Sequence, residues 1–442
     1  MALNRRGLLT GGIGAVAAGL LSGCGGKDLD DLLAQAATVP KSTARLTWWV
    51  SEIPSRRGAV VADLIIRAFE RRHPQIRVSK INAMSTSDGN RSALTTQLAG
   101  GSPQPDVYQG DTTWPPQFGH AALALPVEQL LPDGFWDAYP DALRRSSTYL
   151  GKVYAVPFFT DSTYLYYRKD LLAKHGLRVP RTWEELLRTS RTVQQTGDVA
   201  DGFLWQAGVT EALTANVTEF LADAGAPVLD ERGRAALGGP EAERAFSLMA
   251  EFTSSGVTPS NVTTWAESDS QDAFVSGRGL FLRNWSYAWV NASTPEVSRV
   301  AGKVGVALRP GFEGTGRSGN SCAGGWSNFI NPSSRHLGAA VAFARFCAGD
   351  EVQRLLAREA GVVPALTSAL HSKEARAVGD ATVLRAADLR LVDRPVQTPY
   401  YPQVSKALYT PANSVVGGDL SPAAGVRAAG DGLRAALEGK SQ

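Results

Sequence analysis

The chain has 442 residues, of which 43% are hydrophobic and 20% are charged, a balance typical of a globular protein rather than a disordered or fibrous one. This length allows two or three domains. The formal net charge is only +3, and two of the positive charges, Arg5 and Arg6, lie close to the N-terminus, so nucleic acid is not an expected partner.

The first 23 residues have the pattern of an export signal. Arg5 and Arg6 precede residues 7–22, which are all small or apolar. This run is too short for a hydrocarbon core of about 30 Å but suits the apolar part of a signal peptide. Residues 21–24, Leu-Ser-Gly-Cys, resemble a bacterial lipobox, and the paired arginines resemble a twin-arginine signal.

We therefore predict a signal peptide over residues 1–23 and a lipid on Cys24, which becomes the N-terminus after cleavage. The chain would be anchored by lipid at the outer face of the cytoplasmic membrane, because no later segment is long and apolar enough to span it. The alternative is a plain signal peptide with an incidental cysteine.

The next part of the chain alternates between strand and helix patterns. Residues 24–44 are expected to form a tether. The composition then predicts strands at 45–50, 76–78 and 106–108, and helices at 57–72 and 92–99. This alternation favours an α/β fold with a parallel sheet and helices on its faces.

The middle of the chain repeats this alternation. Helices are predicted at 183–196, with Thr182 as the N-cap, and at 241–255. Residues 311–321 are rich in Gly and Ser and read as a linker, and the chain from His336 onward is mostly helical. Further strands are predicted at 153–157, 163–167, 279–282 and 304–308.

The cysteines and histidines suggest neither a metal site nor a cofactor. The chain has no CxxC, and its five histidines are far apart in sequence. Besides Cys24 there are Cys322 and Cys347. In an oxidising compartment they could form a disulfide, but two buried free thiols are equally compatible with the sequence.

Four groups of segments, taken together, resemble the extracellular solute-binding proteins (family 1) of ABC sugar importers. Their order and spacing extend over nearly all of the chain after residue 44. They are PDVYQGDTTW at 105–114, GKVYAVP at 151–157 followed by YLYYRKDLL at 164–172, DAFVSGRG at 272–279 followed by NWSY at 284–287, and AGGW at 323–326.

Within that family, the chain is most similar to trehalose- and maltose-type sugar-binding lipoproteins of actinobacteria. The resemblance implies a two-lobed α/β fold of the periplasmic-binding-protein type, class II, with a hinge and a central ligand cleft. It places lobe 1 at 45–158 plus 304–332 and lobe 2 at 159–303 plus 333–442. It implies a monomeric binding protein, not an enzyme, which captures a carbohydrate such as trehalose or maltose and delivers it to an ABC permease.

A sugar site needs polar groups that orient hydroxyls and aromatic rings that pack on the C–H faces. The resemblance carries such roles onto Asp111, Asp161, Glu267, Trp285, Gly325 and Arg394. Related trehalose binders have an amide where this chain has Asp161, which leaves the sugar open. From composition and from closeness to those positions we add Trp48, Trp49, Glu52, Trp114, Tyr164 and Trp326.

Structural roles are the alternative for these residues. Asp111 could cap a helix, Asp161 and Glu267 could be solvated loop charges, Trp285 could belong to a core, and Arg394 could pair with a nearby aspartate on the surface.

Other functions are also compatible with the sequence. A receptor for a glycerophosphodiester, an amino sugar or a metal would use the same fold. Tyr400 and Tyr401 are the candidate metal ligands, but adjacent residues of an extended segment point in opposite directions. An exported glycosidase is a further alternative, since Asp111, Asp161 and Glu267 could supply an acid and a base.

Overall fold

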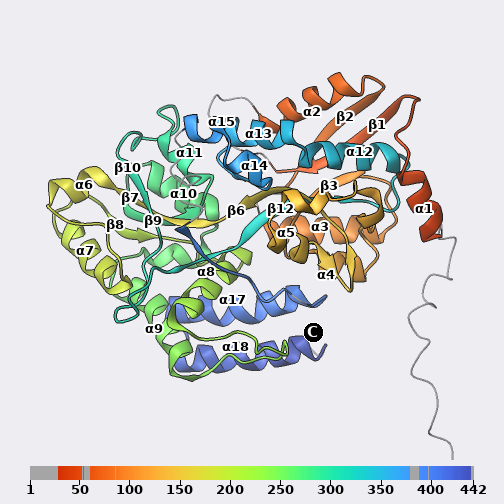
Figure 1. Ribbon diagram of the computed structural model, residues 1–442. Coiled ribbons are helices and arrows are strands. Elements are labelled where there is room, and N and C mark those ends of the chain that lie inside the picture. Colours follow the sequence, from red (N-terminus) through yellow and green to blue (C-terminus); the bar gives the residue numbers. More distant parts are fainter. Residues whose placement is uncertain are drawn as a thin grey trace, which may run out of the picture.

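The protein folds into two lobes, each with its own β-sheet and its own hydrophobic core. Figure 1 shows the lobes side by side, with strands β6 (Val156–Asp161) and β12 (Gly324–Ile330) between them. The structure is a computed structural model that describes residues 28–51, 53, 60–84, 86–378, 388–396 and 398–439.

The first lobe is built on a six-stranded sheet. Strand β1 is parallel to β2 and β3, whereas β12 runs antiparallel to β3 and β6, so the sheet is mixed rather than parallel as predicted. The reason is that β12 re-enters this sheet from the other lobe. The spatial order is β13 (Val363–Pro364), β6, β12, β3 (Val107–Asp111), β1 (Ala44–Val50) and β2 (Ile76–Asn82).

Helices cover this sheet, and the alternation of buried and less buried side chains along β1 shows why. Leu46, Trp48 and Val50 are buried, while the residues between them are less so, as expected for a strand that turns alternate side chains toward a core. The elements of this lobe are α1 (Leu29–Ala36), α2 (Val61–Arg72), α3 (Ser87–Ala99), α4 (Pro115–His120), η1 (Glu128–Leu130), η2 (Phe135–Ala138), α5 (Asp141–Ser146), the hairpin β4 (Thr148–Tyr149) and β5 (Lys152–Val153), α12 (Leu337–Ala348), α13 (Asp350–Glu359), α14 (Thr367–Leu370) and α15 (Lys373–Val378).

The second lobe is built on a four-stranded sheet in the order β10 (Val304–Ala307), β7 (Thr163–Arg168), β9 (Gly279–Trp285) and β8 (Asp201–Leu204). Its central helix α8 (Glu211–Ala224) is buried on nearly all sides. The other elements are α6 (Lys169–Lys174), α7 (Trp183–Gln195), α9 (Gly239–Ser254), η3 (Ser260–Thr264), α10 (Glu267–Val275), α11 (Ala288–Ser293), α17 (Tyr401–Gly417) and α18 (Pro422–Leu437).

The chain passes from one lobe to the other three times: between β6 and β7, between β10 and β12, and between α15 and α17. The second and third passages lie side by side, because β11 (Asn320–Cys322) pairs with β14 (Arg390–Val392).

This arrangement differs from the predicted lobe boundaries at two places. Strand β10 belongs to the second sheet, although residues 304–332 were assigned to lobe 1. Helices α12 to α15 pack on the first lobe, although the whole of 333–442 was assigned to lobe 2. The second passage follows β10 instead of preceding it, and the third follows α15 instead of preceding α12. The sequence pattern does not reveal where these two passages occur.

Candidate functional site

A cavity lies between the two lobes. Its volume is about 220 Å³, and it opens to solvent at its mouth. The first lobe contributes residues from the ends of β1, β3 and β6 and from the start of α3, and the second lobe contributes residues from α8, α10 and the end of β9. The lining residues are Ser51, Ile53, Met84, Thr86, Ser87, Asn90, Asp111, Phe159, Asp161, Glu211, Ala212, Glu267, Trp285, Tyr287, Gly324, Gly325, Trp326, Val362 and Arg394.

A buried ion cluster joins the two lobes at this cavity. Arg394, which follows β14, donates to both carboxylate oxygens of Asp111 at the end of β3, over 2.8 and 3.2 Å. Its Nη1 also donates to Glu211 at the start of α8 over 2.7 Å. Burial disfavours the charged guanidinium, but the acidic groups around it, Asp111 foremost, together outweigh burial and raise the pKa of Arg394 well above its usual value.

Glu211 is the second-lobe end of this cluster. Its carboxylate also accepts hydrogen bonds from the Tyr401 hydroxyl and from Ser405 Oγ. Its backbone N–H donates to Asp88 of the first lobe over 2.6 Å, which adds a direct contact between the lobes. Burial raises the pKa of Glu211, and the positive charge of Arg394 opposes that shift.

Asp161 ends β6, where the chain first leaves the first lobe. Its Oδ1 accepts hydrogen bonds from the backbone N–H of Ser162, and from the N–H and hydroxyl of Ser286 over 2.9 and 2.6 Å. Burial raises the pKa of Asp161 to about 6, even though these hydrogen bonds favour the charged form. Asp161 is thus a buried cavity carboxylate whose pKa is raised well above its ordinary value of 3.8.

Trp285 and Glu267 belong to the part of the cavity wall that the second lobe supplies. The Arg283 guanidinium lies 5.1 Å from the centre of the Trp285 ring. Gly324 also approaches this ring, so closely that a Cβ there would lie 2.5 Å from Trp285 Cζ3. Burial raises the pKa of half-buried Glu267, and Arg283 opposes that shift.

Gly325 is required by the backbone. Its φ is +140°, a value that side-chain-bearing residues rarely adopt, and a Cβ at this position would lie 2.7 Å from the Phe159 carbonyl oxygen. The absence of a side chain therefore allows β12 to lie against β6 beside the cavity.

Seven of the predicted site residues line the cavity, and four others lie outside its lining. Trp48 and Trp114 are buried in the cores of the first lobe and Tyr164 is buried in the core of the second. Trp49 is half-buried and donates through Nε1 to the cavity residue Asn90. Glu52 and Cys24 lie outside the described residues. The seven predicted residues that line the cavity are Asp111, Asp161, Glu267, Trp285, Gly325, Trp326 and Arg394.

Sequence reasoning missed several lining residues, of which Glu211, Tyr287, Phe159 and Asn90 carry the most useful chemistry. A signal existed for Tyr287, because it closes the NWSY segment two residues after Trp285. Glu211 gave none, since an acid in the first turn of a helix is commonplace.

Cys322 and Cys347 are both free and buried, so they do not form the disulfide that the sequence left open. Burial raises the pKa of Cys322 to about 12. In the described parts of the chain, no three His, Cys, Asp or Glu side chains gather in a way that could hold a metal ion. None of the helices in these parts has the length and apolar character that a membrane span requires.

The sequence matches the family model described as bacterial extracellular solute-binding protein over residues 54–354. The chain belongs to this family. The predicted membership is thereby confirmed, and this solute-binding protein is not an enzyme, because the family and the relatives below are binding proteins.

Two curated relatives of this solute-binding protein span most of its length. A protein of Deinococcus radiodurans named "Probable ABC transporter-binding protein" is 29% identical over 348 residues, 77% of this chain and 81% of the relative. The mannitol-binding protein of Pseudomonas aeruginosa is 28% identical over 314 residues, 70% of this chain and 71% of the relative.

Solved structures confirm the predicted two-lobed fold. Maltose-bound MalE3 of T. maritima has a TM-score of 0.82 and 29% identity, and the alignment covers 89% of this solute-binding protein and 99% of MalE3. The GacH receptor of Streptomyces glaucescens has a TM-score of 0.79 at 22% identity, covering 91% and 100% of the two chains, and supports the fold alone.

Proposed function

We propose that this protein captures a carbohydrate in the cavity between its lobes and delivers it to an ABC permease. A disaccharide such as maltose or trehalose is the ligand that we expect. One observation carries the proposal: the described cavity wall combines four carboxylates and a guanidinium with four aromatic side chains. The carboxylates are those of Asp111, Asp161, Glu211 and Glu267, and the aromatic residues are Phe159, Trp285, Tyr287 and Trp326.

The chemistry of the wall suits a polyhydroxylated ligand. Carboxylates form strong hydrogen bonds with hydroxyls, and the C–H faces of a pyranose pack on aromatic rings. Asp161 is better placed for this than Asp111, because Arg394 donates to both Asp111 oxygens, whereas the donors of Ser162 and Ser286 all donate to Oδ1 of Asp161. The maltose in the MalE3 structure and the name of the mannitol-binding relative support a sugar or a polyol.

Capture and delivery would depend on lobe movement. A solute held by groups from both lobes favours the closed arrangement, and a permease that recognises that arrangement would distinguish loaded from empty protein. The anchoring of the chain by a lipid on Cys24 is part of the same proposal. It is tested by asking whether Cys24→Ser releases the protein from the membrane fraction.

Calorimetry with maltose, trehalose and mannitol tests the ligand class, together with the shift in melting temperature that a ligand of the folded state causes. We expect a disaccharide to bind and Trp285→Ala to weaken binding about tenfold or more. The matched control is Trp289→Ala, because Trp289 is also a half-buried tryptophan of the second lobe but does not line the cavity. Binding of mannitol alone would make this a polyol receptor, and binding of none of the three would refute the ligand class.

A further inference from the structure

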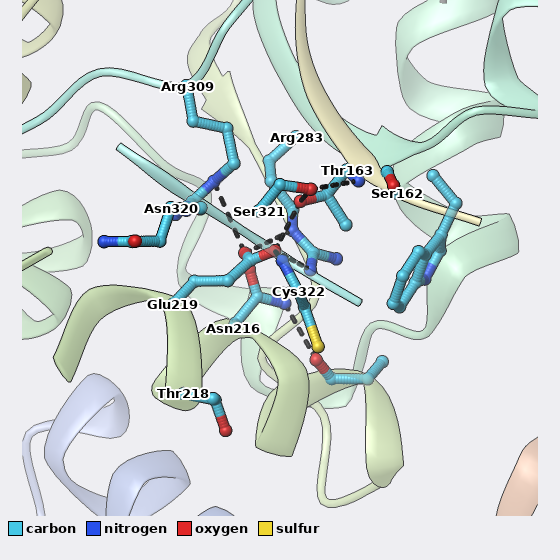
Figure 2. A network of polar contacts seen from close by, with 12 residues as sticks. Ser162, Thr163, Asn216, Thr218, Glu219, Arg283, Arg309, Asn320, Ser321 and Cys322 are labelled. Atoms are coloured by element: carbon cyan, nitrogen blue, oxygen red, sulfur yellow. Dashed lines mark hydrogen bonds and ion pairs between the residues drawn. The ribbon is translucent and has the colours of Figure 1, made fainter. Parts of the chain in front are cut away.

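A second charged cluster lies behind the cavity wall, centred on Glu219 of α8. Figure 2 shows Arg283, Arg309 and Thr163 pointing toward this carboxylate from separate segments. Glu219 and Arg283 are fully buried, and they are joined by two contacts of 2.9 Å, one to each carboxylate oxygen. Burial would raise the pKa of Glu219, but Arg283 and Arg309 outweigh it and lower that pKa.

Glu219 also binds two of the segments that pass between the lobes. It accepts hydrogen bonds from the Thr163 hydroxyl, at the start of β7, and from the Cys322 backbone N–H in β11, the latter over 2.8 Å. In addition, the Thr163 backbone N–H donates a hydrogen bond of 2.8 Å to the Ser321 hydroxyl. The Thr163 hydroxyl and the Cys322 N–H therefore hold the Glu219 carboxylate, so two of the segments that pass between the lobes set its position.

Arg283 transmits this position to two cavity residues. Its guanidinium lies over the Trp285 ring, and its Nη1 donates to Gln206 Oε1 over 2.9 Å. Gln206 in turn donates to Ser270 Oγ over 2.6 Å, and Ser270 donates to the carbonyl of Glu267 over 2.9 Å. A continuous set of bonded groups therefore connects Glu219 with both Trp285 and the first residue of α10.

We propose that Glu219 and Arg283 are positioning residues, which hold Trp285 and Glu267 in the orientation that the cavity wall requires without contacting the solute. The proposal rests on the proposed function where it concerns affinity, because Trp285 is assumed to touch the ligand. The geometric part, that Arg283 holds the Trp285 ring, stands without any ligand.

Arg309 provides an internal control for this proposal. It is equally buried, lies 3.3 Å from Glu219 Oε2 through Nε, and contacts Asp223 over 3.4 Å. Its guanidinium, however, lies 5.1 Å from the Trp183 ring, which belongs to the core of the second lobe. The two arginines share one carboxylate but face different tryptophans.

The test uses ¹⁹F NMR of the full chain labelled with 5-fluorotryptophan, with the resonances of Trp285 and Trp183 assigned by Trp→Phe replacement. Arg283→Lys keeps a positive charge near Glu219 but removes the planar group over Trp285. We expect Arg283→Lys to shift or broaden the Trp285 resonance only, Arg309→Lys the Trp183 resonance only, and Glu219→Gln both. An unmoved Trp285 resonance in Arg283→Lys, or equal effects of the two lysine variants on it, would overturn the proposal.

Calorimetry with maltose and mannitol on the same variants supplies the functional arm. Arg283→Lys should weaken binding of whichever ligand the unaltered protein takes by about tenfold, while Arg309→Lys should leave it within about twofold. Equal losses in both variants would refute the positioning role. If the unaltered protein binds neither ligand, the proposed ligand class fails, and the NMR result still decides whether Arg283 holds Trp285.

Discussion

Arg394 binds Asp111 across the boundary between the lobes, through two hydrogen bonds between residues 283 positions apart in the chain. Since Arg394 also binds Glu211, a single guanidinium separates two buried carboxylates from opposite lobes. The cluster therefore both stabilises the fold and forms part of the cavity wall. Unfolding measurements test the first of these roles.

Arg394→Gln should lower the free energy of unfolding by about 3–5 kcal/mol, because it leaves buried charges of like sign without their partner. Urea unfolding measures this change. Arg390→Gln is the control, since Arg390 lies on β14, is exposed and donates to the Ser318 carbonyl. A change within about 0.5 kcal/mol is expected. Similar values for both variants would show that the cluster adds nothing to stability.

Asp161 should make stability fall as pH rises. Its pKa in the folded protein, about 6, is above the ordinary value of 3.8, so the folded state holds the proton more tightly than the unfolded state does. The associated stability is present below about pH 4 and is lost as pH rises through 6, by at most about 3 kcal/mol.

The measurement for Asp161 is the difference in unfolding free energy between the natural chain and Asp161→Asn from pH 4 to pH 7. Taking the difference removes the contributions of the other acids. Asparagine keeps the acceptor for Ser286, so the difference should change with pH in that window. A difference that stays constant would show that Asp161 titrates at its ordinary pKa.

Gly325→Ala should destabilise the protein by about 1–3 kcal/mol, from backbone strain and from the contact with the Phe159 carbonyl. Thermal unfolding measures the loss. Gly100→Ala is a suitable comparison, because Gly100 has a φ of −73° and a Cβ there meets nothing closer than 3.4 Å. It should be neutral or slightly stabilising, and the same loss at both glycines would argue against a special role for Gly325.

The two described cysteines should be unreactive in the folded protein. Burial raises the pKa values of Cys322 and Cys347, and thiolate is the reactive form. In a Cys24→Ser chain, a thiol reagent at pH 8 should label neither cysteine until urea is added, and then both. Labelling of only one thiol after unfolding, or none, would contradict the free-thiol assignment.

Local structure was predictable wherever the signal lay within a few residues. Thr182 caps α7 as predicted, by accepting a hydrogen bond from the Glu185 backbone N–H over 3.1 Å. The strand predicted at 45–50 is β1, with one more residue at its start. Helix α3 begins at Ser87, earlier than the predicted 92, because its cap is Thr86.

Long-range partners were not predictable from residue type. Trp48 and Trp114 are of a residue type that sugar sites use, yet adjacent aromatic rings and apolar helices bury them. Nothing in the sequence around Glu211 indicates that Arg394 would lie against it, since their pairing depends on the third passage between the lobes. The resemblance to a family located Asp161 and Trp285, but only the fold brings Tyr287 and Phe159 beside them.

The packing of α1 determines which half of the molecule would be held in place. Helix α1 lies against α12 of the first lobe (Figure 1). The chain just after α1 also approaches α12, so closely that a Cβ at Gly338 would lie 1.8 Å from the Thr38 carbonyl oxygen. A tether attached ahead of α1 would therefore restrain the first lobe directly. The second lobe, with Trp285 and Glu267, would be the half that moves relative to the membrane when a solute arrives or leaves.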